Sequence, residues 1–132
     1  MIVADTNLII YLFIMGDQTS LAQKVLHKDP QWIVPPLWQS EFLNVLAAYV
    51  RRGMTLAQAR QIMEDALVTL KDRQIIPSYE KILDLIAESD CTACDCEFVA
   101  LARQLSIQLV TADKQLLEQF PDCAISLEEF VK

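Results

Sequence analysis

Glycine is scarce in this sequence, with only two residues among 132. The phosphate-binding loops of nucleotide-binding proteins need several closely spaced glycines, so P-loop and dinucleotide-binding fingerprints are excluded. No apolar run approaches the ~20 residues needed to span a bilayer. The N-terminus, MIVADTN, lacks the basic segment of a signal peptide. We therefore expect a cytoplasmic protein that does not enter the membrane.

Basic residues are also few. The chain has 11 Lys and Arg against 18 Asp and Glu, which gives a formal net charge of −7. Proteins that bind nucleic acid by counterion release usually carry a basic face. If the protein acts on nucleic acid, it must therefore bind cations at its site or contact the nucleic acid through a local patch.

The length and composition indicate one globular domain over residues 1–132. A chain of this size buries enough surface to fold without disulfides or a structural metal. Apolar residues make up 53% of it, which argues against disorder. In a cytoplasmic protein we expect the four cysteines to be free thiols.

Short β-rich runs alternate with helical patterns along the chain. We expect strands at 2–4, 32–34, 74–76, 107–111 and 124–126. We expect helices at 8–14, 20–28, 36–52, 55–71, 78–88, 92–105 and 114–119, and a final turn at 127–131. This alternation predicts an α/β fold, with a mostly parallel sheet of four or five short strands covered on both faces.

Two acidic residues follow predicted strands. Asp5 ends the first strand, and Asp113 comes two residues after the strand at 107–111. Ligands of open α/β sheets bind outside the carboxyl ends of the strands. Both carboxylates are therefore expected at the same functional edge.

Two further acids interrupt apolar helix faces. Glu41 lies on the face formed by Leu37, Trp38, Val45 and Ala48. Asp95 shares a face with Phe98, Val99 and Ala102. Each acid is close to the start of its helix, so each is expected near the edge of the sheet that carries Asp5.

Four clustered carboxylates cannot all stay ionised in a partly buried site without a cation. Either some are protonated or a divalent ion binds, and an all-oxygen ligand set selects Mg²⁺ or Mn²⁺. Each acid alone has an ordinary explanation. Asp5 and Asp113 can cap the helices that follow them, Glu41 can pair with Arg52, and Asp95 suits a helix start. The conjunction of the four favours a site.

The cysteines at 91, 94 and 96 do not match a zinc site. Structural zinc usually takes two separated Cys-x₂-Cys pairs or histidines, whereas Cys123 is distant and His27 is the single histidine. Cys94 and Cys96 are two residues apart and face different sides of a helix. We expect these thiols to be buried as small apolar groups around Asp95.

Three stretches resemble a known family. VADTNLIIYL resembles the opening strand and Asp-x-Asn motif of PIN-domain ribonucleases, and PPLWQSEFLNVL is similar to their Pro-x₄-Glu helix. CDCEFVALARQLSIQLVTADKQL resembles their C-terminal signature. The resemblance spans residues 2–116 and predicts a PIN-like three-layer α/β/α sandwich. The compact size resembles VapC toxins of toxin–antitoxin pairs.

The resemblance implies a ribonuclease that uses Mg²⁺ or Mn²⁺ bound by the four acids. It also implies that Asn7 and Thr111 support the acidic site. It further implies that the protein forms a homodimer and is inhibited by a cognate antitoxin. One departure is Cys94, where the family commonly has an aromatic residue.

A mechanism follows from these expectations. Asp5, Asp95 and Asp113 would bind the metal, and Glu41 would bind or orient the attacking water, with a role as general base. Arg103 and Lys114 are candidates for holding RNA.

Two other function classes remain open. A phospho-receiver also clusters acids beside Thr and Lys, but Pro35 and Pro77 stand where it needs a strand-ending acceptor Asp. An aspartate-nucleophile phosphatase would have Asp rather than Asn7. A non-catalytic module is the remaining alternative, because the same pocket can receive a basic peptide.

Overall fold

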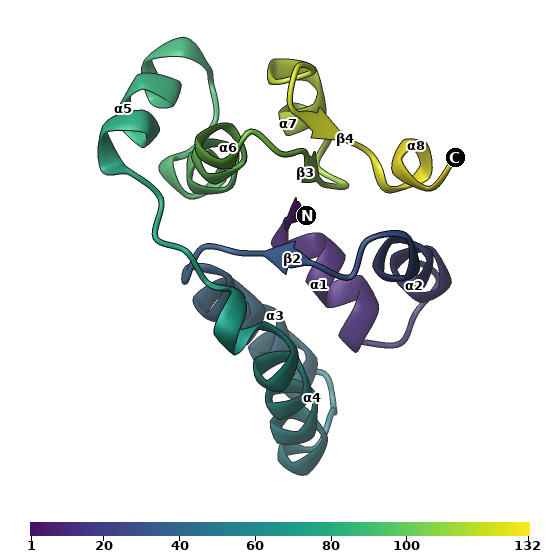
Figure 1. Ribbon diagram of the computed structural model, residues 1–132. Helices are drawn as coiled ribbons and strands as arrows, with labels where there is room; N and C mark the ends of the chain where they lie inside the picture. The colour runs from purple at the N-terminus through teal and green to yellow at the C-terminus, as the bar shows by residue number, and fades with distance from the viewer.

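The computed structural model describes residues 1–132 and contains a parallel sheet between two layers of helices (Figure 1). The strands are β1 (Ile2–Ala4), β2 (Trp32–Ile33), β3 (Leu109–Val110) and β4 (Ala124–Ile125). Their order is β2-β1-β3-β4, and every pair is parallel. The predicted three-layer α/β/α fold is confirmed.

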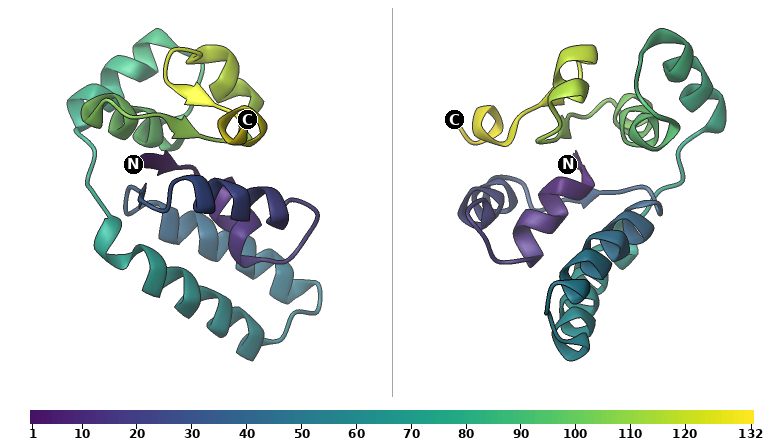
Figure 2. Two further views of the ribbon diagram at one scale, coloured as in Figure 1. Left: turned by 45° about the vertical axis from the view of Figure 1, so that its right-hand side comes forward. Right: turned by 180° about the vertical axis from the view of Figure 1, so that it is seen from behind.

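Eight α-helices and one 3₁₀ turn connect or follow the strands. They are α1 (Thr6–Phe13), α2 (Thr19–Lys28), α3 (Trp38–Arg51), α4 (Leu56–Leu70), η1 (Lys71–Arg73), α5 (Tyr79–Glu88), α6 (Ala93–Leu105), α7 (Lys114–Gln119) and α8 (Leu127–Val131). None is long and apolar enough to cross a bilayer. Helices α3 and α4 form a hairpin that projects from the rest of the molecule (Figure 2).

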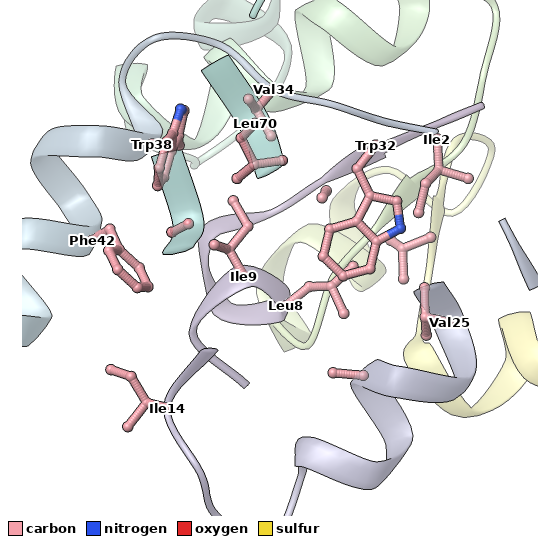
Figure 3. Close-up of a cluster of buried hydrophobic side chains, with 14 of the residues drawn as sticks. Ile2, Leu8, Ile9, Ile14, Val25, Trp32, Val34, Trp38, Phe42 and Leu70 are labelled. Atoms are coloured by element: carbon pink, nitrogen blue, oxygen red, sulfur yellow. The ribbon is translucent and has the colours of Figure 1, made fainter. Parts of the chain in front are cut away.

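Alternate residues of β1 face two different cores. Ile2 and Ala4 face a cluster that includes α1, α2, α3, α4 and α8, whereas Val3 faces a cluster with α5, α6 and α7. This alternation follows from the two-residue period of a strand. In the first cluster, Leu8 and Ile9 of α1 lie between Trp32 and Trp38 (Figure 3).

The expected strand at 74–76 is wrong. Gln74 makes an isolated bridge to Val34, and the chain then runs without further pairing to α5. Pro77 lacks the N–H that a continuing ladder needs. The β-rich composition of this segment suited a strand, but its pairing with the chain at Val34 stops after the one bridge.

Candidate metal centre

The carboxyl ends of the parallel strands all reach one edge of the sheet, and four acidic residues lie at or near it. Asp5 directly follows β1, and Asp113 follows β3 by three residues. Glu41 and Asp95 lie in the first turns of α3 and α6, which run back from this edge. We call Asp5, Glu41, Asp95 and Asp113 the edge acids.

Asp5 is the most buried of the edge acids, with 8% of its surface exposed. Its Oδ1 accepts a hydrogen bond from the Thr6 N–H at 2.8 Å, and its Oδ2 accepts from Thr111 Oγ1 at 2.6 Å and Asn7 Nδ2 at 3.2 Å. Burial raises the pKa of Asp5 to about 6, although the bonds from Thr111 and Thr6 oppose this. The charges of Glu41 and Asp95 raise it further.

Asn7 and Thr111 join β1 to the segment that follows β3. Thr111 is fully buried, and its Oγ1 also accepts from the Asp113 N–H at 2.9 Å. Asn7 Oδ1 accepts from the Ala112 N–H at 3.1 Å. These bonds fix the carboxylate of Asp5 relative to the backbone that carries Asp113.

Glu41 is held by a residue that the sequence analysis did not single out. Thr6 Oγ1 donates to Glu41 Oε1 at 2.6 Å and so links the first residue of α1 to α3. Burial raises the pKa of Glu41, the bond from Thr6 opposes this, and the charge of Asp95 adds to the increase.

Asp95 lies in the first turn of α6, where the side chain of Thr92 caps the helix by accepting from the Asp95 N–H at 3.1 Å. Burial raises the pKa of Asp95, hydrogen bonding with Thr92 opposes this, and the charge of Asp113 raises it further. Asp113 is the N-cap of α7, and its Oδ1 accepts from the N–H groups of Gln115 and Leu116. Asp113 is therefore a helix cap as well as an edge acid.

A fifth carboxylate, Glu97, also belongs to this electrostatic neighbourhood. Burial raises its pKa, and the charge of Glu41 adds to the increase. Its proximity to Glu41 depends on how α6 packs relative to α3. The spacing of residues in the sequence therefore could not predict that Glu97 lies near Glu41.

No basic side chain neutralises the edge acids. The four ion pairs of the protein involve other carboxylates, and Glu41 is not paired with Arg52. The positive charge nearby comes from helix N-termini, because α1, α3, α6 and α7 each begin beside one edge acid. The partial positive charges of these helix ends offset only part of the negative charge of the four carboxylates.

The chemistry of this donor set fits a hard divalent ion. Every donor is a carboxylate oxygen, and a cation would offset both the burial of these carboxylates and the lesser repulsion between them, which together raise the pKa values of three of them. As the side chains are placed, no three of the His, Cys, Asp and Glu residues are close enough to hold one ion. Asp95 and Asp113 are half-exposed, and Asp113 is also held as the cap of α7, whereas Asp5 is buried and fixed by its three hydrogen bonds.

The cysteines beside Asp95 are free thiols. Cys91 and Cys96 are buried, as expected, whereas Cys94 is exposed, contrary to the expectation. Cys91 precedes the N-cap Thr92, and Cys96 lies four positions into the helix. Apolar residues at these two positions pack together and stabilise a helix start.

The two predicted RNA-binding residues lie in different places. Lys114 is exposed and directly follows Asp113. Arg103 is in the last turn of α6, near the opposite edge of the sheet, and pairs with Glu88 at 3.4 Å and Asp122 at 3.2 Å. The structure does not bring Arg103 to the edge acids, because α6 runs antiparallel to the strands.

Comparison with known proteins supports the fold and the family. The PIN domain model matches residues 2–121. The chain is 26% identical to ribonuclease VapC3 of Pyrobaculum aerophilum over 124 residues, which cover 91% of this chain and 95% of that protein.

Solved structures share the same fold at lower sequence identity. PAE2754 from Pyrobaculum aerophilum has a TM-score of 0.77 at 20% identity, covering 98% of this chain and 92% of that one. FitAcB from Neisseria gonorrhoeae has a TM-score of 0.77 at 14% identity, covering 97% and 99%. A toxin–antitoxin complex from Klebsiella pneumoniae has a TM-score of 0.71 at 20% identity, covering 96% and 98%. With the family model matching most of its length, the chain belongs to the PIN domain family.

Proposed function

We propose that this protein is a Mg²⁺- or Mn²⁺-dependent endoribonuclease and the toxin of a VapBC-type toxin–antitoxin pair. The observation that carries the proposal is the group of edge acids, which have no cationic partner and three of which, Asp5, Glu41 and Asp95, have raised pKa values. Membership of the PIN domain family and the similarity to a ribonuclease named VapC3 support it.

The edge acids divide into two roles. Asp5, Asp95 and Asp113 would hold the ion, and Asp5 is the one whose carboxylate is fixed by three hydrogen bonds. Bound Mg²⁺ or Mn²⁺ supplies positive charge to the anionic phosphate oxygens and makes water more acidic. Asn7 and Thr111 hold Asp5 in place, in the way that hydrogen-bond partners orient metal ligands.

Glu41 acts on the attacking water. Its Oε1 is occupied by the Thr6 hydroxyl, which leaves Oε2 to accept a proton from water as the water oxygen bonds to phosphorus. The bond from phosphorus to the leaving ribose oxygen breaks in the same displacement, and that oxygen takes a proton from solvent. A raised pKa brings a glutamate closer to the neutral range that suits a general base. Lys114 is the basic side chain best placed to contact an RNA phosphate.

Two protein partners belong to the proposal. A cognate antitoxin would place a basic group in the acidic pocket and so take the position of the cation. A second copy of the chain would form a homodimer, for which exposed apolar residues on one face of α5 (Tyr79, Leu83 and Ile86) are available. Light scattering of the purified protein measures whether the dimer exists.

The decisive experiment is cleavage of RNA with and without Mn²⁺ by the wild type, Asp5→Asn and a control, Asp122→Asn. Asp122 is an exposed acid at the other edge of the sheet, so its loss should leave cleavage unchanged. We expect the wild type to cleave only with Mn²⁺ and Asp5→Asn to lose ~100-fold or more of the rate. Retained cleavage by Asp5→Asn would refute the role of Asp5, and phosphorylation of Asp5 by a small phosphoryl donor would favour a phospho-receiver.

A further inference from the structure

Thr6 makes a hydrogen bond to each of two edge acids. Its backbone N–H donates to Asp5 Oδ1 at 2.8 Å, and its Oγ1 donates to Glu41 Oε1 at 2.6 Å. The second distance is in the range of a hydroxyl bonded to an ionised carboxylate, about 2.5–2.7 Å. Thr6 is only 7% exposed, so water competes poorly for either bond.

The hydroxyl of Thr6 is not needed to form α1. Asp5 is the N-cap of that helix, and Thr6 is its first residue. The only hydrogen-bond partner of the hydroxyl is Glu41, 35 residues later in the sequence. The β-branched side chain has few rotamers, so the direction of the hydroxyl is well defined.

Glu41 depends on this one bond more than Asp5 depends on any of its own. Asp5 accepts from three donors, whereas the carboxylate of Glu41 accepts from Thr6 alone. Glu41 is also half-exposed and is repelled by Asp95. Without the Thr6 hydroxyl, no hydrogen bond from the protein would hold the carboxylate of Glu41 in place.

We propose that Thr6 is a positioning residue that holds the carboxylate of Glu41 beside that of Asp5, so that both act at the same divalent ion. The role rests on the proposed metal-dependent function and adds a residue to it. Thr6 acts through its hydroxyl, and its methyl group serves packing only.

Two substitutions at Thr6 distinguish the contribution of its hydroxyl from that of its methyl group. Thr6→Val keeps the shape and removes the donor, whereas Thr6→Ser keeps the donor and removes the methyl group. The dissociation constant for Mn²⁺ can be measured by electron paramagnetic resonance without RNA, and kcat and KM for RNA cleavage can be measured separately.

We expect Thr6→Val to bind Mn²⁺ about tenfold more weakly or worse, because Glu41 would contact the ion through the water that it orients, and loss of a hydrogen bond that positions such a group weakens metal binding. Its kcat should fall while KM for RNA changes little. Thr6→Ser should match the wild type in both. Thermal unfolding without metal checks that each variant is folded, and Thr6→Ala replaces Thr6→Val if the valine variant does not fold.

A double-mutant cycle tests whether Thr6 acts through Glu41. In a Glu41→Ala background, Thr6→Val should have no further effect on Mn²⁺ affinity. Equal Mn²⁺ affinity in the wild type and Thr6→Val would overturn the proposal, and so would equal weakening in Thr6→Val and Thr6→Ser. A wild type that binds Mn²⁺ but cleaves no RNA would overturn the nuclease function alone, and a wild type that binds no Mn²⁺ would overturn both.

Discussion

The carboxylates at the two edges of the sheet have different electrostatic surroundings. At the amino edge, Asp29 pairs with the N-terminal ammonium of Met1, and Asp122 pairs with Arg103. At the carboxyl edge, the edge acids have no cationic side chain and the pKa values of three of them are raised. The carboxylates at the amino edge are paired with cationic groups of the chain, whereas those at the carboxyl edge have no cationic side chain beside them.

Asp29 and Asp5 show the contrast most directly. At Asp29 burial is the largest single cause and raises the pKa, but the hydrogen bonds and the charge of the N-terminal ammonium together outweigh it, and the pKa is lowered. At Asp5 burial dominates and the pKa rises to about 6. A carboxylate with a raised pKa destabilises the folded protein at neutral pH, and such unfavourable carboxylates are common at functional sites.

The largest expected effect is on the pH dependence of stability without metal. The folded pKa of Asp5, about 6, is above its ordinary value of 3.8. Stability from its protonation is therefore complete below about pH 4 and is lost as pH rises through about 6, by about 3 kcal/mol. Urea unfolding in chelator at pH 5 and pH 7 measures the part of this loss that falls between these two pH values, about 1.3 kcal/mol.

Two controls sharpen this result. Asp5→Asn stays neutral, so much of the fall between pH 5 and pH 7 should disappear in this variant. Mn²⁺ should also reduce the fall in the wild type, because the ion binds the ionised acids. Equal stability at both pH values in metal-free wild type would show that Asp5 ionises without cost.

A smaller effect on stability is expected when one carboxylate charge is removed at each edge of the sheet. Asp95→Asn should raise the melting temperature of the metal-free protein by about 2–4 °C, because it removes a charge near Glu41 and Asp113. Asp122→Asn should leave it unchanged or slightly lower. A clear fall for Asp95→Asn in calorimetry would show that its carboxylate has a structural role.

The smallest effect is expected at Arg103. Arg103→Met keeps the apolar stem against Phe120 and removes two ion pairs that are largely exposed. Such pairs contribute about 0–1 kcal/mol each. The free energy of unfolding should change by no more than ~2 kcal/mol, and the rate of RNA cleavage should not change. A large loss of cleavage would restore Arg103 as a candidate RNA-binding residue.

The sequence predicted the fold and the edge acids because both depend on local patterns. Strand and helix ends can be recognised from the chain, and a parallel sheet brings all carboxyl ends to one edge. Thr6 was missed because a threonine at a helix start is ordinary, and its partner is 35 residues away. Arg103 was misplaced because a residue eight positions after Asp95 on the same helix lies ~12 Å along its axis.

The junction between β1 and α1 consists of Asp5 alone, since the strand ends at Ala4 and the helix begins at Thr6. One inserted residue there would turn the start of α1 by about 100° relative to the strand and carry Thr6 and Asn7 away from their partners. Changes of chain length should therefore be tolerated in the turn between α1 and α2, residues 14–18, and rejected at position 5. A scan of single-residue insertions along the chain should therefore show a sharp minimum in fitness at position 5.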